Sequence, residues 1–507
     1  MSDYPDSVAF LGQWGRFQQV VFFLLCASIV PNGFGAFNLV FLTDAPGHRC
    51  SVPDVGLTED WRAAIIPVQV VNGNQQLSRC SRFRLDVVRN LSAQGLVPGR
   101  DVNLTDLEQE GCVDGWSYSR DVYQSTIVSE FDLVCSEQWK LTFISTVFFV
   151  GVLLGSFFSG QLSDRFGRKP VLFLTMGVQM VFTFIQVFST SWIMFTVLLF
   201  INGLGQISNF VAALVLGTEI LTGHVRVLYS SMGACLSFTL GYMMLPGCAY
   251  LLRDWTSLLL ALSLPCLAYL PLWWFIPESP RWLLSQGRVE EAESIVRKAA
   301  KWNKVQAPLV IFQDYTPLAS PRFATCTGYY GLSFNTSQLH ADPYMSCFIS
   351  AAVEVPAYIS GWLVLRYFPR RRSICCSLLL QAVSLFLIQL VPQTLPYLSI
   401  ALEMLAKYFV TITFSMMFAY IAELYPTLLR NTAVGVCSTV GRLGNCIAPF
   451  LITLNTYVLH LPYIIIGTLG CVAALAALYI PESFGQPLPE TIQQMHKRER
   501  WALYTEF

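Results

Sequence analysis

Long apolar stretches separated by short polar ones run through most of the chain. Eleven of them have about 18 or more residues, enough to cross the roughly 30 Å hydrocarbon core of a bilayer as helices. They lie at 20–42, 141–162, 170–188, 192–216, 227–251, 256–276, 346–365, 374–392, 396–421, 433–456 and 461–480. An open sheet edge cannot face lipid, so the pattern predicts an all-α polytopic membrane protein.

The composition also indicates a membrane protein and limits the kinds of partner that we expect. Of the 507 residues, 54% are hydrophobic and only 13% are charged, and the mean hydropathy is +0.51. A disordered chain or a set of soluble domains would carry more charge. The 32 basic residues balance the 32 acidic ones, so no bulk positive field attracts nucleic acid. We expect membrane lipid as a partner and no nucleic acid.

Basic residues gather in alternate loops, which places those loops in the cytoplasm. They cluster at 165–169, 281–304, 366–372 and 497–500, whereas the loops near 189–191, 335–345, 391–397 and 456–463 have no Lys or Arg. Both termini are then cytoplasmic. The predicted parts are a cytoplasmic N-terminus (1–19), an N-terminal helical half (20–276), a cytoplasmic linker (277–322), a C-terminal helical half (323–481) and a cytoplasmic tail (482–507).

The polar segment 43–140 is predicted to be extracellular, within the N-terminal half. It holds four cysteines, Cys50, Cys80, Cys112 and Cys135. An even number of cysteines in an oxidising compartment predicts two disulfides, with three possible connectivities. The segment also holds two glycosylation sequons, at Asn90 and Asn103.

One crossing is incomplete in the sequence. The sixth span ends inside and the stretch at 346–365 must begin outside, so the chain must cross between them. The apolar candidate is 323–334, which as a helix covers roughly 18 Å and falls short of the core. A third sequon, at Asn335, would lie outside and agrees with a crossing. We expect a shortened seventh span.

A charged motif follows the second span and has counterparts later in the chain. The run from Gly160 to Lys169 contains Asp164, Arg165 and Arg168, which can form a conformational latch between helix ends. A weaker copy runs from Gly361 to Arg372. Pro-Glu-Ser, with Glu278 and then Arg281, ends the first half and recurs at 481–483. These segments resemble the major facilitator superfamily, which implies two six-helix halves.

Further motifs resemble the organic cation/carnitine branch of the organic ion transporter family. They are Asp3-Tyr4, Phe10-Leu-Gly-Gln-Trp-Gly15, Ile29-Val-Pro-Asn-Gly-Phe34, Gly205-Gln-Ile-Ser-Asn209 and Ala422-Glu-Leu-Tyr-Pro-Thr427. The resemblance runs from residue 3 to about 493, with a break near 305–326. It implies sodium-coupled transport of carnitine and related zwitterionic or cationic quaternary amines across the plasma membrane by alternating access, with no cofactor beyond the co-transported sodium.

Two other functions stay open at this point. One is sodium-independent facilitated diffusion of organic cations, and the other is a non-transporting variant disabled by the incomplete seventh span. An enzyme is not expected, because no nucleophile or paired-carboxylate constellation is present and the five histidines show no metal-site spacing.

Ionisable side chains inside spans are costly and are therefore candidates for function. They are Glu354, Glu403, Lys407 and Arg442. Glu354, Lys407 and Arg442 are predicted to bind substrate. Glu403 and Lys407 are spaced i,i+4, so the alternative for this pair is mutual neutralisation with no substrate role. Arg442 can hold a carboxylate with its two-pronged guanidinium, and the resemblance implies this role, with a structural role as the alternative. Glu423 is expected to act as a latch.

Aromatic faces and amide oxygens complete the expected site. A quaternary ammonium is recognised by aromatic rings, for which the resemblance points to Phe210, Phe238, Tyr329 and Tyr420. Core or lipid-facing positions are the alternative. Sodium prefers oxygen ligands, and the candidates are Gln179, Gln206, Asn209 and Asn32. Hydrogen bonds between helices are the alternative for these amides.

The C-terminus offers one further partner. It reads Thr505-Glu-Phe507, a pattern that PDZ domains bind by adding the peptide as an extra strand. A frayed tail is the alternative.

Overall fold

A computed structural model describes residues 7–53, 56–71, 74–308, 343–392, 396–424, 441, 444, 446–448, 450, 461–478 and 482. The chain divides into two compact units. One is Val40–Phe143 together with Leu252–Ser257, and the other takes in the remaining residues. Each unit is described by itself below.

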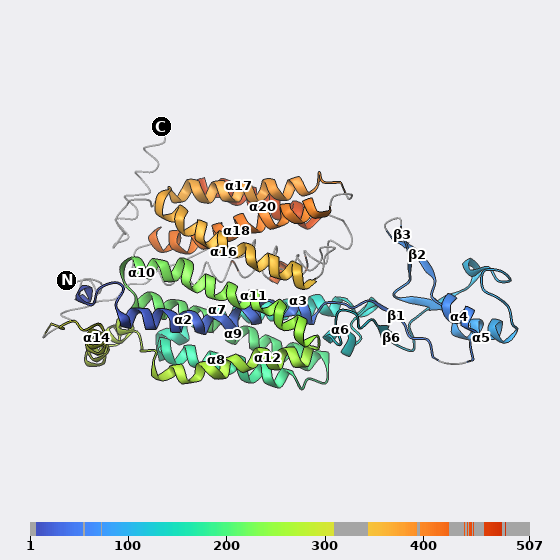
Figure 1. The fold of residues 1–507 in the computed structure, drawn as a ribbon, viewed down its shortest axis with the longest axis horizontal. Coiled ribbons are helices and arrows are strands. Elements are labelled where there is room, and N and C mark those ends of the chain that lie inside the picture. The colour runs from blue at the N-terminus through green and yellow to red at the C-terminus, as the bar shows by residue number, and fades with distance from the viewer. Residues whose placement is uncertain are drawn as a thin grey trace. The chain divides into compact units, whose positions relative to one another are not determined.

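The larger unit is helical, and its helices fall into an N-terminal and a C-terminal half. The N-terminal half has α2 (Arg16–Phe37), α7 (Trp139–Phe166), α8 (Arg168–Gln186), α9 (Trp192–Ile220), α10 (Gly223–Leu228), the π-helical turn η4 (Tyr229–Gly233), α11 (Ala234–Leu252), α12 (Trp255–Tyr269) and η5 (Leu270–Trp274). The C-terminal half has α16 (Pro343–Tyr367), α17 (Arg370–Ile388), α18 (Pro396–Leu424) and α20 (Leu461–Leu478). Figure 1 shows the four C-terminal helices gathered as one group beside the N-terminal ones.

Ten helices in the described residues are long and apolar enough to cross a membrane, and they correspond to ten of the eleven predicted spans. The membrane-spanning helical fold is therefore confirmed. The remaining predicted span, 433–456, lies almost entirely outside the described residues, and so does the short stretch 323–334. The shortened seventh span stays a prediction.

Short helices connect the N-terminal segment with the chain that follows α12. They are η1 (Ala9–Leu11), α13 (Pro280–Ser285) and α14 (Val289–Asn303). Val8 packs with Trp282 and Val296 in a small apolar core. The amide of Asn303 donates to the Leu11 carbonyl at 3.1 Å and accepts from the Phe17 amide at 2.9 Å. These bonds fix the end of α14 to the start of α2.

The smaller unit adds short strands to the fold. β1 (His48–Cys50) pairs with β6 (Trp116–Tyr118), β2 (Val68–Val71) with β3 (Asn74–Leu77), and β4 (Ser81–Phe83) with β5 (Gln109–Gly111), all antiparallel. The helices are α3 (Leu39–Leu42), at the border of the two units, α4 (Glu59–Ala64), α5 (Leu85–Ala93), η2 (Leu104–Asp106), α6 (Ile127–Glu130) and η3 (Cys135–Glu137). A small core around the fully buried Trp61 supports this unit.

Charge and disulfides compensate for that small core. The buried Arg82 pairs with Glu110 at 2.9 Å and with Asp114 at 2.6 Å. Of the three possible connectivities, the structure has Cys50–Cys112 and Cys80–Cys135. Closing two long loops restricts the unfolded chain, which favours the folded unit.

Small residues let α2 and α11 approach closely. A β-carbon on Gly241 would overlap the carbonyl oxygen of Val30 and lie 3.1 Å from the Cα of Gly33. Glycine at this crossing therefore permits backbone contact between the two helices, as is common in membrane proteins. This contact brings the aromatic side chains of α2 and α11 together.

We predict that Gly241→Ala destabilises the protein by about 1–3 kcal/mol, because the added methyl group forces the helices apart. The measurement is the melting temperature of the purified protein in detergent. Gly247→Ala is the matched control on the same helix, since a β-carbon there meets nothing within 4 Å. Equal melting temperatures for the two variants would contradict the proposed close crossing.

Candidate functional site

A buried ion pair lies inside the C-terminal half. Glu354 on α16 and Lys407 on α18 are both 0% exposed, and the Lys407 Nζ lies 3.2 Å from a Glu354 carboxylate oxygen. The Lys407 ammonium also donates a hydrogen bond to the hydroxyl of Ser350, one turn before Glu354. Desolvation of two charges is costly, so further hydrogen bonds are needed to hold such a pair.

The N-terminal half supplies those hydrogen bonds from α11. The hydroxyl of Thr239 donates to the second carboxylate oxygen of Glu354 at 2.9 Å. The hydroxyl of Tyr242 donates to Ser350 at 3.3 Å, and its ring centroid lies 4.9 Å from the Lys407 Nζ. The ion pair is therefore joined to both halves of the molecule. We call these five residues the central charge cluster.

Aromatic rings extend from this cluster into the N-terminal half. The Tyr242 ring stacks on Phe37 of α2 at 4.0 Å between centroids. Phe37 meets Phe238 edge-on at 6.1 Å, and Phe238 meets Phe210 of α9 edge-on at 6.1 Å. Phe210 and Phe238 were predicted from the sequence, whereas Phe37 and Tyr242 were not. The i,i+4 spacing of Phe238 and Tyr242 on one helix was the available signal.

Two further candidates from the sequence, Tyr420 and Glu403, have other neighbours. Tyr420 is buried in an apolar cluster of the C-terminal half with Ala357 and Met416. Glu403 is 2% exposed and accepts a hydrogen bond from the Tyr463 hydroxyl of α20 at 3.1 Å. Lys407 forms an ion pair at 3.2 Å with Glu354 on the neighbouring helix α16, whereas Glu403 lies on the same helix as Lys407.

The amide side chains expected to hold sodium lie together between α2, α8 and α9. The Asn32 amide donates to the Asn209 carbonyl oxygen at 2.8 Å, and the Gln206 amide donates to the Asn32 main-chain oxygen at 2.8 Å. Gln179 and Gln206 both lie beside Gly35. The side-chain oxygen of Asn32 is buried and has no hydrogen-bond partner among the described residues. We call these four side chains the amide cluster.

The charged motif between α7 and α8 forms a second cluster, centred on Arg168. Its guanidinium bonds both carboxylate oxygens of Glu219 at 3.0 Å and pairs with Asp164 at 2.7 Å. Glu219 was not predicted from the sequence, although it is an acidic residue just after the predicted span 192–216. Arg165 is exposed and lies over the Phe166 ring instead.

A glutamate caps the first helix after the motif in each half. Glu278 accepts from the backbone amides of Arg168 at 3.0 Å and Lys169 at 3.2 Å, at the start of α8. Glu482 accepts from the amides of Arg370 at 2.8 Å and Arg371 at 3.1 Å, at the start of α17. The repeated Pro-Glu-Ser segments thus make the same contact twice. A carboxylate there satisfies free N–H groups and complements the helix dipole.

Burial affects the first of these caps. It raises the pKa of the Glu278 carboxyl, and the backbone amides of Ser279, Lys169 and Arg168 partly offset the rise. Gly167, at the end of α7, has a φ of +103°, a conformation that favours glycine. A β-carbon there would lie 2.6 Å from a Glu278 oxygen, so glycine also makes room for the cap. Arg281 follows in α13 and is half-buried.

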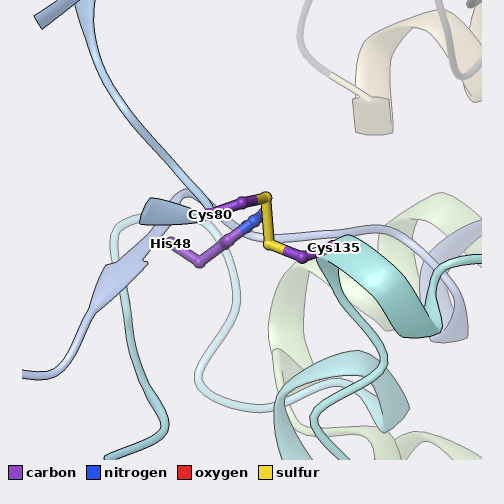
Figure 2. Close-up of side chains that lie close together, drawn as sticks. All are labelled: His48, Cys80 and Cys135. Atoms are coloured by element: carbon purple, nitrogen blue, oxygen red, sulfur yellow. A yellow bond between two sulfur atoms is a disulfide. The ribbon is translucent and has the colours of Figure 1, made fainter. Parts of the chain in front are cut away.

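In the smaller unit, both sequon asparagines, Asn90 and Asn103, are exposed. Figure 2 shows the imidazole of His48 beside the Cys80–Cys135 disulfide, with ligand atoms of all three within 4.8 Å of one another. The two sulfurs are bonded to each other and cannot act as thiolate ligands. This grouping is therefore a disulfide with a neighbouring histidine.

Several expected site residues lie outside the described residues. They are Arg442, Tyr329, Asn335, Thr505, Phe507 and the side chain of Glu423. Their roles stay predictions.

Comparisons with known proteins show which proteins the chain is similar to. The family model described as "Sugar (and other) transporter" matches residues 109–315, and the one described as "Major Facilitator Superfamily" matches residues 344–502. Organic cation/carnitine transporter 2 of Rattus norvegicus is 51% identical over 524 residues, covering 98% of this chain and 94% of the relative. The Homo sapiens protein of that name is 50% identical over 524 residues, with the same coverage. Solute carrier family 22 member 4 of Mus musculus is 50% identical over 526 residues, covering 98% and 95%.

Solved structures show the same fold. The proton:xylose symporter XylE bound to a bromo-deoxyglucose matches with a TM-score of 0.59 at 15% identity, covering 94% of this chain and 98% of that one. XylE of E. coli in a partially occluded inward-open conformation matches with a TM-score of 0.60, covering 93% and 100%. The major facilitator fold expected from the sequence is confirmed. Homologues and fold are those of transporters, not of enzymes.

We predict that Glu278→Gln lowers the free energy of unfolding by about 1 kcal/mol, because a neutral amide caps the start of α8 less well than a carboxylate. The matched control is Glu290→Gln, an exposed glutamate in the first turn of α14. Melting temperature in detergent is the readout. A loss in the control as large as in Glu278→Gln would show that the cap has no special effect.

Proposed function

Because the chain belongs to the organic cation/carnitine transporter family of the major facilitator superfamily, we propose that it carries carnitine and related quaternary amines across the plasma membrane by alternating access, coupled to sodium. The observation that carries the proposal is the central charge cluster. It places a carboxylate, an ammonium and an aromatic face where the two halves meet. A small zwitterion needs these three kinds of partner.

The two ends of carnitine need different partners. Its quaternary ammonium cannot donate a hydrogen bond, so it binds to aromatic faces and to a carboxylate. Tyr242 stacked on Phe37 supplies the faces, and Glu354 supplies the negative charge. The carboxylate end binds to Arg442, whose guanidinium matches two carboxylate oxygens.

Alternating access requires the contacts between the halves to break and form again. Three such contacts involve α11 or the turn before it: Thr239 to Glu354, Tyr242 to Ser350, and the Ser415 hydroxyl to the main-chain oxygen of Ser231 at 3.4 Å. Each is a single hydrogen bond. The two neutral bonds contribute about 1 kcal/mol each, and the bond to the Glu354 carboxylate contributes about 1.5–3 kcal/mol. Rocking of the halves around the central cluster therefore meets no large barrier from these bonds.

Sodium binds in the amide cluster. Buried polar atoms without a hydrogen-bond partner are rare in folded proteins and commonly mark a missing water or ion. The Asn32 side-chain oxygen is one such atom, and Gln206, Asn209 and Gln179 add amide groups around it. Neutral oxygen donors suit an alkali cation that must be released during each cycle.

A second function, sodium-independent facilitated diffusion of organic cations, is favoured by the hydrogen bonds within the same amide cluster. The amides of Asn32, Gln206 and Asn209 bridge α2, α8 and α9 through hydrogen bonds to one another and to main-chain oxygens. In that case the amides serve packing alone. A non-transporting variant is the third possibility, and the uptake measurement below separates all three.

The remaining features fit a plasma-membrane protein with cytoplasmic termini. The exposed asparagines Asn90 and Asn103 carry glycans on the outer side, and Asn335 carries a third. The C-terminal Thr505 and Phe507 bind a PDZ-domain scaffold on the inner side.

We predict saturable uptake of labelled carnitine in cells expressing the chain, and a loss of most of it when sodium is replaced by an impermeant cation. Uptake is normalised to surface protein. Sodium-independent uptake of tetraethylammonium without carnitine uptake would favour the facilitator. No uptake of either compound at a normal surface amount would favour the disabled variant.

We predict that Asn32→Ala raises the sodium concentration for half-maximal uptake by about tenfold or more, because it removes one hard oxygen ligand. Asn202→Ala is the control. Asn202 also bridges α8 and α9, accepting from Thr183 and donating to Gln186, both at 3.1 Å. It reports the loss of helix bridging alone. Equal effects of the two variants on sodium dependence would rule out the amide cluster as the sodium site.

A further inference from the structure

The ammonium of Lys407 occupies a site that suits a substrate ammonium. It has a carboxylate at 3.2 Å, an aromatic ring centroid at 4.9 Å and a neighbouring hydroxyl, all fully buried. A carboxylate beside an aromatic face is the combination that attracts organic cations. The protein therefore fills a cation site with its own side chain, which is tethered and able to swing aside on four methylene groups.

The charge of this site depends on both members of the pair. Glu354 and Lys407 together carry no net charge. A monocation that displaced the lysine from Glu354 would leave an extra positive charge in a buried place, which is costly. A zwitterion placed between them brings one charge of each sign. Its ammonium meets Glu354 and Tyr242, its carboxylate meets the released Lys407, and the net charge of the site is unchanged.

We infer that Lys407 is a specificity-determining residue, which makes the site prefer a zwitterion of separated charges, an ammonium and a carboxylate, over a simple monocation. The substrate inserts into the Glu354–Lys407 pair and replaces one ion pair with two. This inference rests on the proposed transport function and extends it. Lys407 and Arg442 were both predicted from the sequence to bind substrate. A carboxylate has two oxygens and can pair with both cations.

The position of Ser350 strengthens this assignment. Its hydroxyl accepts from Lys407 and from Tyr242, so it holds the ammonium of one half close to the ring of the other. A substrate that moves the lysine also releases this contact. Glu403, one turn before Lys407 on α18, contributes negative charge in every variant below, so comparisons between variants depend only on the charge that is changed.

The experiment compares uptake of carnitine and of tetraethylammonium by the full chain in cells, normalised to surface protein. In Lys407→Met, Glu354 lacks its counter-charge, which a monocation can supply. The ratio of carnitine to tetraethylammonium uptake efficiency falls by about tenfold or more, with a lower KM for tetraethylammonium. Lys407→Arg keeps the charge and the ratio. Lys301→Met, at an exposed lysine of α14, is the matched control and changes neither.

A double variant separates the effect of the unpaired charge from the effect of the room left by the substituted side chain. Glu354→Gln with Lys407→Met leaves the same room as the single change but no unpaired carboxylate, so it does not gain affinity for tetraethylammonium. A gain as large as in Lys407→Met would show that space, not charge, controls the preference, and would overturn the inference. If Lys407→Met does not reach the cell surface, Glu354→Gln alone tests the inference. The ratio of carnitine to tetraethylammonium uptake is then expected to change in the opposite direction. In Glu354→Gln the lone lysine excludes tetraethylammonium more than carnitine, and an unchanged ratio would overturn the inference.

Failure of this inference is distinguishable from failure of the proposed function. The unsubstituted chain reports the function, because it transports carnitine or does not. If it transports both probes and the ratio is the same in Lys407→Met, the transport function stands and Lys407 does not set specificity. If it transports tetraethylammonium better than carnitine, the neutral pair does not favour zwitterions and the inference is wrong.

Discussion

A charged side chain inside a membrane protein must find its counter-charge within the protein, because the surrounding lipid offers none. Glu354 and Lys407 meet this requirement across two helices of the C-terminal half, and Thr239 and Tyr242 complete their hydrogen bonds from the other half. In the proposed mechanism, relative motion of the halves changes the surroundings of the pair, and a substrate at the pair changes the contacts between the halves. One electrostatic requirement would then link binding to conformation.

Other polar groups in the larger unit follow a division by depth along the helices. Neutral amides, at Asn32, Gln206 and Asn209, occupy the helix interiors, where hydrogen bonds between helices satisfy them at lower cost than charges. Two glutamates lie at helix ends, where Glu278 and Glu482 cap corresponding helices of the two halves. The two halves therefore share a structural contact as well as a sequence motif, because in each half a glutamate carboxylate accepts from the free amides at the start of the corresponding helix.

The sequence predicted several residues of the site individually, but not which of them contact one another. Glu354 and Lys407 were identifiable because ionisable residues inside apolar stretches are rare and costly. Their partnership was not, since the i,i+4 spacing pointed to Glu403 as the partner of Lys407. Phe37 and Tyr242 were missed because 14% of the chain is aromatic, so no single ring stands out.

By itself, the sequence determined the membrane-spanning helices and the family, because hydropathy is a local property and the motifs are contiguous. It also determined that four cysteines of one loop form two disulfides. The tertiary structure alone decided how those cysteines pair and that Thr239 and Tyr242 join the Glu354–Lys407 pair. It also decided that the side-chain oxygen of Asn32 has no hydrogen-bond partner among the described residues. These facts depend on how each helix is rotated and packed against its neighbours. A small rotation of one helix changes every partner along its length, and no local pattern fixes that rotation.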